Sequence, residues 1–295
     1  MSESYSLISA REHFLSQPVV SSFTSYMAEY IAGRVFDPPY LTQTYRPKAQ
    51  YCFTSLEDAW DQYIQEDSNR RFEQDLLEYE SQLRETIQKR DDDAFIGLVQ
   101  KIFAARPLVL RSNIEKIKVV KNLTENIDYA CGVLSTDSPD YTVFGRVYGP
   151  AMSSFYSRIY ATLIADFITY ESRVCAALCY LIREYCLFCG IDLPEDLNWG
   201  SLHGWGKTNG DVSRNASWEN NLFLPLDRIK KRPMRERTFA RSNILASWCV
   251  TDAIAKAKKS PKGTKWLEGI YPIRKVEASL YMLGAELPPA DPKLL

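Results

Sequence analysis

The chain has 295 residues, of which 45% are hydrophobic and 25% are charged, and its formal net charge is −1. This composition is ordinary for a soluble globular protein and provides enough material for a large core. The sequence shows no secretion signal and no apolar run that could span a bilayer, so we expect a cytoplasmic protein without a membrane partner.

The N-terminal part of the chain predicts helices separated by one irregular stretch. An amphipathic helix is expected around Val20 to Ala32, because Gly33 and the prolines after it stop the pattern. The Pro- and Tyr-containing stretch from Tyr40 to Phe53 predicts a loop. A further helix opens where Ser55 serves as the cap, with Asp58 three residues on.

The helical pattern continues, with interruptions, to Ala105, and the polar stretch from Arg70 to Arg90 predicts an exposed helix on a core. Residues 57–93 hold 13 acidic and 5 basic residues, which we interpret as solvated helix faces. Arg106-Pro107 indicates a boundary between an N-terminal helical lobe, residues 1–105, and a second lobe, residues 106–295. We therefore expect a mainly α fold, a two-lobed helical bundle.

The central segment, Tyr141 to Ile182, runs turn, helix, short break, helix. Two glycines and a proline between Gly145 and Pro150 forbid a continuous helix there. From Ala151 to Phe167 apolar residues recur at intervals of three and four, so one helix face is buried. The run from Val174 to Phe188 is apolar almost all round and predicts a central helix, with Glu171 at its N-terminal end.

This order resembles the helix-hairpin-helix DNA glycosylase superfamily, in which a glycine-rich hairpin grips a DNA phosphate and a later carboxylate attends a flipped-out nucleotide. The resemblance covers Tyr141 to Ile182, with Glu171 standing where the family carries Asp. Met152 stands where bifunctional members carry Lys, so the implied enzyme is monofunctional and leaves an abasic site. The hairpin residues implied to hold DNA are Gly145, Arg146, Gly149, Met152, Ser153 and Ser154.

Glu171 is the implied catalytic residue, because a carboxylate stabilises an oxocarbenium-like state or deprotonates the attacking water. The alternative is that Glu171 only caps the helix that follows it. Asp166 is the second candidate, although its apolar flanks also suit a residue that ends a helix. Arg173 pairs with Glu171 or with a phosphate, and Tyr170 either walls a base pocket or belongs to the core.

Residues 190–225 form a long stretch rich in glycine, asparagine and tryptophan. Such a loop is often functional, and its rings and amides can stack on an extruded base and bond its edge. The alternative is a packed surface loop whose tryptophans cover the core. The residues expected to read the base, together with Tyr170, are Trp199, His203, Trp205, Asn209 and Trp218.

The C-terminal part is basic: residues 228–275 hold 14 Lys and Arg against 3 acidic residues, which predicts a polyanion-facing surface. A helix is expected over Thr238 to Ala257, a short last helix within Trp266 to Leu283, and a disordered tail from Pro288. The basic residues expected on the DNA backbone, with Arg173, are Lys230, Lys231, Arg232 and Arg241.

We expect no metal and no cofactor. The two histidines, His13 and His203, lack metal-ligand spacing. Three cysteines follow the spacing of the iron–sulfur loop in some helix-hairpin-helix glycosylases, but Glu195 stands at the fourth position. We interpret them as buried reduced thiols: Cys179, Cys186 and Cys189.

The expected function is therefore hydrolysis of the base–sugar bond of a damaged or modified base in DNA. The long polar loop favours a bulky, phage-type base. DNA is the expected partner, and no obligatory protein partner is evident. The first alternative is a non-catalytic helical protein that binds DNA or another partner. A nuclease ranks third, because we find no carboxylate cluster to hold metal ions.

Overall fold

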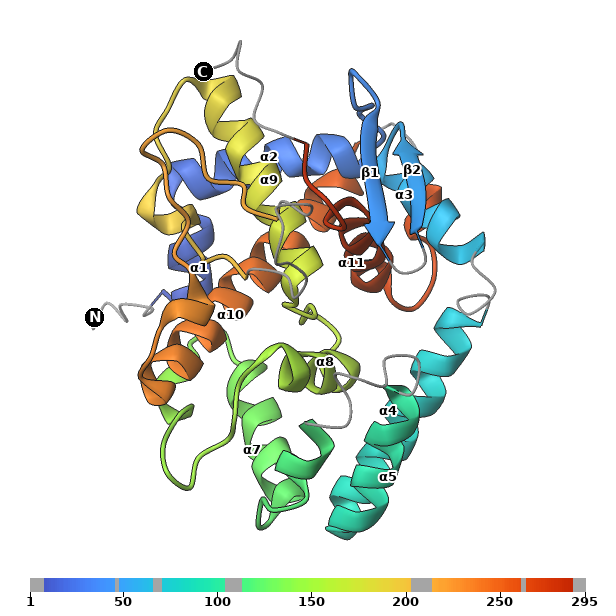
Figure 1. Ribbon diagram of the computed structural model, residues 1–295, viewed down its shortest axis with the longest axis vertical. Helices are drawn as coiled ribbons and strands as arrows, with labels where there is room; N and C mark the ends of the chain where they lie inside the picture. Colours follow the sequence, from blue (N-terminus) through green and yellow to red (C-terminus); the bar gives the residue numbers. More distant parts are fainter. Residues whose placement is uncertain are drawn as a thin grey trace, which may run out of the picture.

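The computed structural model describes residues 8–45, 48–65, 71–103, 113–202, 214–260 and 264–288. Over these ranges the fold is mainly α-helical, as predicted, with one two-stranded antiparallel sheet (Figure 1). No helix in the same ranges has the length and apolar character needed to cross a membrane.

The larger group of elements lies in the upper part of Figure 1. There α2 packs against α10, and α11 packs against both α3 and α9. This group consists of α1 (Ala10–Leu15), α2 (Pro18–Ile31), β1 (Tyr40–Tyr45), β2 (Lys48–Phe53), α3 (Leu56–Gln65), α9 (Ser172–Cys189), α10 (Arg232–Ala257) and α11 (Pro272–Leu283).

A second group of helices lies below the first in Figure 1. It consists of α4 (Phe72–Lys89), α5 (Asp92–Ile102), α7 (Leu123–Leu134) and α8 (Ser154–Leu163). Both groups contribute side chains to one hydrophobic cluster. The predicted boundary at Arg106-Pro107 lies outside the described residues, so the division into lobes at that point stays a prediction.

Two helix boundaries confirm the sequence-based predictions in atomic detail. The helix α2 ends at Ile31 and is followed by Gly33 with φ +100°, a left-handed value that glycine adopts without strain. At the start of α3, Ser55 Oγ accepts from the Asp58 N–H at 3.1 Å, and the Asp58 carboxylate accepts from the Thr54 N–H at 2.8 Å. These bonds satisfy N–H groups that the first turn leaves without partners.

The stretch Tyr40–Phe53 is a β-hairpin and not the predicted loop. Its first strand alternates, with Tyr40 and Thr42 buried and Leu41 exposed, which is the pattern of a half-buried strand. The buried side chains bond to the end of α11 and to the residues that follow it: the Tyr40 hydroxyl donates to the Leu283 carbonyl at 2.9 Å. Thr42 Oγ1 exchanges two hydrogen bonds of 2.9 Å with the Glu286 backbone. The alternation was too short to stand out from the sequence.

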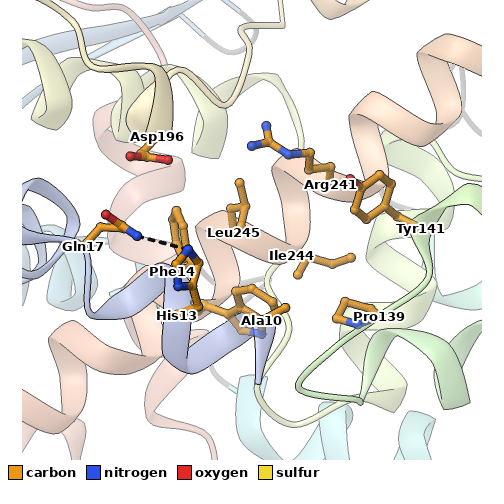
Figure 2. Close-up of a pocket in the computed structure, with 11 residues that line it drawn as sticks. Ala10, His13, Phe14, Gln17, Pro139, Tyr141, Asp196, Arg241, Ile244 and Leu245 are labelled. Atoms are coloured by element: carbon orange, nitrogen blue, oxygen red, sulfur yellow. Dashed lines mark hydrogen bonds between the residues drawn. The ribbon is translucent and has the colours of Figure 1, made fainter. Parts of the chain in front are cut away.

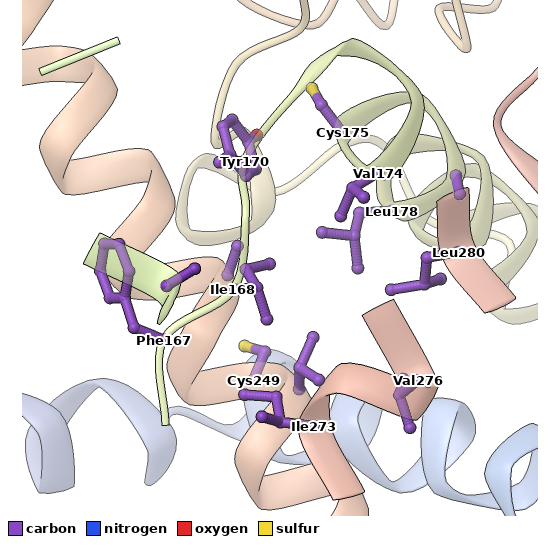
Figure 3. Packing of buried hydrophobic residues seen from close by; sticks show 14 of the residues in the cluster. Phe167, Ile168, Tyr170, Val174, Cys175, Leu178, Cys249, Ile273, Val276 and Leu280 are labelled. Atoms are coloured by element: carbon purple, nitrogen blue, oxygen red, sulfur yellow. The ribbon is translucent and has the colours of Figure 1, made fainter. Parts of the chain in front are cut away.

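Part of the core lies where α9, α10 and α11 meet, as Figure 3 shows. Val174 and Leu178 of α9 face Val276 and Leu280 of α11, and all four are 1% exposed or less. Each such side chain contributes about 1.5–3 kcal/mol relative to an exposed position. The all-round apolar character of residues 174–188 thus identified a central helix correctly.

The helix α8 ends at Leu163, earlier than the predicted Phe167, because Arg274 of α11 takes over its last carbonyl groups. The buried guanidinium of Arg274 donates to the carbonyls of Ala161, Ile164 and Phe167. A helix C-terminus carries partial negative charge, so a cation suits this position.

Glu277, one turn further along α11, completes this junction. Its Oε2 forms an ion pair with Arg274 and accepts from the Thr169 N–H at 2.9 Å. A buried charge is tolerated when it is paired and hydrogen-bonded, and Arg274 meets both conditions. The link between α8 and α9 is therefore held by two charged side chains of the last helix.

Asp92, in the first turn of α5, supplies the cap that α7 lacks from its own residues. Asn122 makes no side-chain cap bond, and the Asp92 carboxylate instead accepts from the N–H groups of Leu123 at 3.0 Å and Thr124 at 2.9 Å. Burial raises the pKa of Asp92, but the bonds from Thr124 and Leu123 outweigh burial and lower this pKa below its ordinary value.

We predict that Asp92→Asn lowers the free energy of unfolding by about 1–2 kcal/mol at about pH 7. Because the folded-state pKa of Asp92 is lowered, its contribution is present above the unfolded pKa and is lost as the pH falls through the folded pKa. Urea unfolding of both proteins at neutral and strongly acidic pH measures this difference. Asp93→Asn, the same charge change at the exposed neighbour, is the control. Equal effects of the two substitutions would contradict the capping role.

Candidate functional site

Glu171 is the N-cap of α9, the position that the capping alternative describes. Its Oε1 accepts from the N–H groups of Arg173 at 2.9 Å and Val174 at 3.1 Å. The side chain is half-buried. A carboxylate held by two backbone donors at the positive end of a helix has a fixed direction and a stabilised charge. This geometry suits the stabilisation of a nearby cation as well as capping.

Tyr170, directly before Glu171, is fully buried. Its hydroxyl donates to the Gly200 carbonyl at 2.7 Å, and its ring makes an edge-on contact with Phe239 at a centroid distance of 5.7 Å. Burial raises the pKa of Tyr170 well above its ordinary range, so the hydroxyl remains a donor. Tyr170 is a core residue in this structure, and its contact with an extruded base stays a prediction.

The polar loop is fixed at both of its described ends to residues beside Glu171. On one side the Gly200 carbonyl accepts from Tyr170 and from the Cys175 thiol. On the other side the Arg214 guanidinium donates to Ser172 Oγ at 2.7 Å. The loop between these two ends, residues 203–213, lies outside the described residues, and so do three of its expected base-reading residues: His203, Trp205 and Asn209.

The two described tryptophans of this loop are core residues. Trp199 is 1% exposed, donates from Nε1 to the Asp196 carbonyl at 2.7 Å and packs edge-on against Phe23. Trp218 is 5% exposed and contacts Phe223. Their rings cover the core, as the alternative reading of this loop describes.

Asp166 and Arg173 do not join Glu171 in a charged cluster. Asp166 is exposed in the turn between α8 and α9. The Arg173 guanidinium lies 4.5 Å from the centre of the Tyr281 ring, so it makes a cation–π contact where an ion pair with Glu171 was expected. The backbone of Arg173, rather than its side chain, contacts the Glu171 carboxylate.

The turn before α8 is held by contacts that only glycine permits. Gly145 has φ +76° and lies against α10, where a Cβ at this position would be 2.5 Å from Pro233 Cα. Arg146 bonds back to Thr142, and the Gly149 N–H donates to the Arg146 carbonyl at 3.2 Å. The Gly149 N–H is thus used inside the turn and is not directed at solvent.

The first turn of α8 starts later than the sequence indicates. Ser153 is the N-cap, and its Oγ accepts from the Tyr156 N–H. Ser154 is the first helical residue and is half-buried, whereas Met152 is 2% exposed and packs in the core. The unpaired N–H groups of this helix start therefore belong to residues after Ser153 and not to 149–152.

The basic segment forms the start of α10, which begins at Arg232 rather than at the predicted Thr238. Pro233 suits a first helical turn, because its missing N–H would have no partner there. Lys230, Lys231 and Arg232 are exposed, and Arg232 pairs with the buried Glu236 at 2.7 Å.

The turn and the start of α10 lie side by side. Gly145 touches Pro233, and Arg237 Nε donates to the Phe144 carbonyl at 3.3 Å. We call the exposed residues that these two segments present together the basic surface: Arg146, Val147, Tyr148, Lys230, Lys231, Arg232, Arg235 and Arg237. The structure thus brings together two segments for which the sequence analysis separately predicts DNA contact.

A cavity of about 240 Å³ lies against α10 (Figure 2). Arg241, which lines it, is one helical turn along α10 from Arg237 of the basic surface. Its walls come from α1, the chain before the turn, the short helix Glu195–Leu197 and α10, and they include Phe14, Tyr141, Asp196, Arg241 and Trp248. Sequence reasoning placed Arg241 on a DNA backbone and missed Asp196, because four distant segments build this cavity. Glu171 lines neither this cavity nor the one between α4 and α7.

The cysteines lie in the structure as free thiols. Cys179 and Cys186 are buried in α9, and Cys189 is exposed at its end. Burial raises the pKa of Cys186 to about 12. Across the described ranges, no group of three or more His, Cys, Asp or Glu side chains converges as metal ligands do.

The chain matches no family model, and comparison with curated proteins and with solved structures finds no similar protein. Any functional conclusion therefore depends on the geometry described above.

We predict that Gly145→Ala lowers the free energy of unfolding by about 2 kcal/mol or more, because the new Cβ meets Pro233 and the backbone is left-handed. Chemical denaturation measures this loss. Gly132→Ala in α7 is the control, since a Cβ there meets no atom within 4 Å. That control should stabilise the protein by about 0.5–1 kcal/mol. If Gly145→Ala leaves the free energy of unfolding unchanged, the turn does not pack against α10.

Proposed function

We propose that the protein binds DNA through the basic surface. The observation that carries this proposal is the contact of the turn around Gly145 with Pro233. This contact joins the turn and the start of α10, which were each predicted to contact DNA, into one face. Phosphate contacts by Lys and Arg supply most of the affinity of a protein for nucleic acid. A compact face of such residues is what this interaction requires.

The charges of the basic surface are only partly neutralised by the protein itself. Arg146 lies near Asp140 and Arg232 pairs with Glu236. Lys230, Lys231 and Arg235 are exposed, and their side chains make no hydrogen bond or ion pair with the part of the chain that the structure describes. An anionic partner would satisfy them.

The start of α10 adds to the positive potential. A helix N-terminus carries partial positive charge and normally attracts acidic side chains. The first turn of α10 holds no acidic residue, and Lys231 is its N-cap. Cations at this end destabilise the free helix, so their presence supports binding of a polyanion.

The tip of the turn offers an apolar contact as well. Val147 and Tyr148 are 89% and 93% exposed, next to Arg146. An exposed aromatic ring beside cations can stack on a base or enter a groove. This combination favours nucleic acid over a simple inorganic anion as the partner.

We predict that the double substitution Lys231→Ala, Arg235→Ala weakens binding to a labelled DNA duplex. The plot of log affinity against log salt concentration should become less steep: the magnitude of its negative slope should decrease by about 2, one for each lost phosphate contact. Fluorescence anisotropy at several salt concentrations measures both quantities.

The matched control is Lys258→Ala, Lys259→Ala, the same charge change at the other end of α10. These exposed residues lie about 40 Å along the helix from Lys231, at 1.5 Å per residue. The control should keep the affinity and the salt slope of the unsubstituted protein. Equal losses in both double variants would show only a general effect of charge and remove the basic surface from the interaction.

A second candidate function is hydrolysis of a base–sugar bond, with Glu171 stabilising the developing positive charge. Its support is the position of the polar loop, whose two described ends are bonded to Tyr170 and Ser172, the neighbours of Glu171. The described ends of this loop, at Gly200 and Arg214, thus lie beside a fixed carboxylate. We infer a monofunctional glycosylase for this candidate, acting on a damaged or bulky modified base.

We predict that Glu171→Gln reduces the release of free base from modified DNA by about 100-fold or more while DNA affinity stays unchanged. Mass spectrometry of bases freed from damaged and phage-type modified DNAs measures release. Glu195→Gln, an equal charge change at an exposed position, is the control. Should Glu171→Gln release base as well as the unsubstituted protein does, Glu171 is a helix cap only. If the unsubstituted protein releases no free base, non-catalytic DNA binding is the remaining function.

A further inference from the structure

The cavity between α1 and α10 has an apolar floor and a charged rim. Phe14 and Trp248 are 8% and 7% exposed and form part of the floor. Figure 2 shows Asp196 and Arg241 reaching over the cavity above Leu245. The two charged side chains come from different segments, so only the folded chain places them at one opening.

These two charges have no partner among the residues that the structure describes. Asp196 and Arg241 are half-buried, and within the described ranges neither side chain makes a hydrogen bond or an ion pair, even with the other. Partly buried charges without partners are costly, and a ligand that presents both a donor and an acceptor edge would satisfy them.

The cavity continues the basic surface along α10. Arg237, Arg241 and Leu245 follow one another at intervals of four residues, so they share one face of the helix. On the opposite wall, Tyr141 leads directly to the turn that carries Tyr148. A nucleic acid strand that follows the basic surface would therefore pass the opening of the cavity.

We propose that this cavity takes one unpaired nucleobase of the bound strand, and that guanine fits it best. The inference rests on the proposed DNA binding. Arg bonds the O6 and N7 atoms of guanine in a bidentate manner, and a carboxylate accepts from its N1–H and N2–H groups. Trp248 and Phe14 supply the apolar contact that a base needs.

The size of the cavity agrees with a single base. Its volume of about 240 Å³ is below the range of roughly 300–1,000 Å³ that drug-sized ligands occupy. The phosphates of the same nucleotide would stay outside, where Arg237 is exposed. The cavity thus selects a base, while the basic surface supplies affinity that does not depend on sequence.

The test compares two labelled strands by fluorescence anisotropy: an oligothymidylate of about 12 nucleotides, and the same strand with one central guanine. The unsubstituted protein should bind the guanine strand about tenfold more tightly, which is the discrimination of one bidentate contact. Asp196→Asn should abolish this preference. Without base recognition, removal of a negative charge near DNA would tighten binding of both strands equally, so the two explanations predict opposite signs for the guanine strand.

Two further variants separate this inference from the proposed function. Ala10→Trp fills the cavity from an exposed position of α1 and should remove the preference while oligothymidylate binding is kept. Lys231→Ala, Arg235→Ala should weaken both strands and keep their ratio. Equal binding of the two strands by the unsubstituted protein overturns the base site alone. Absence of binding to both strands overturns the base site, and it overturns the DNA-binding proposal as well when the labelled duplex is not bound either.

Discussion

The buried guanidinium of Arg274 is the interaction on which the arrangement of the candidate sites depends. It bonds three carbonyl groups around the end of α8, and its partner Glu277 bonds the backbone at Thr169. Because these bonds fix the link between α8 and α9, they also fix where α9 begins and where Glu171 points. Loss of the Glu277 carboxylate would leave the Arg274 guanidinium buried without its ion pair, which costs several kcal/mol in comparable cases. The junction is therefore a rigid base for the elements that carry Glu171 and the turn.

The long helix α10 connects the two regions to which we assign function. One of its faces carries Arg237 and Arg241, on the basic surface and at the cavity. The face behind them packs Phe239 against Tyr170, the residue before Glu171. A partner that binds the basic surface is thus separated from the start of α9 by little more than the width of one helix. The structure thus places a basic face and a fixed carboxylate on the two sides of one long helix.

The sequence predicted the helices better than it predicted their contacts. The region around α2 was identified by its amphipathic pattern and the region around α9 by its apolar residues on all sides. The cap at Ser55 was identified because its partner stands three residues on. The hairpin from Tyr40 was missed, since a strand of six residues offers few alternations. The start of α10 was missed because its first turns are basic and carry no apolar period. The cavity and the contact of Gly145 with Pro233 join segments that are far apart in the chain. Local patterns of apolar and polar residues therefore do not predict them.

The bonds of Tyr40 and Thr42 to the end of α11 and to the residues that follow it have a consequence for the order of folding. Thr42 and Glu286 are 244 positions apart, and α2 and α10 are also distant partners. Contacts of such long sequence separation slow folding, because a large loop must close before they form. During vectorial synthesis, the hairpin and α2 leave the ribosome long before their partners exist. The N-terminal helices therefore expose their apolar faces until α10 and α11 have been synthesised, and such exposed surface favours aggregation of the nascent chain.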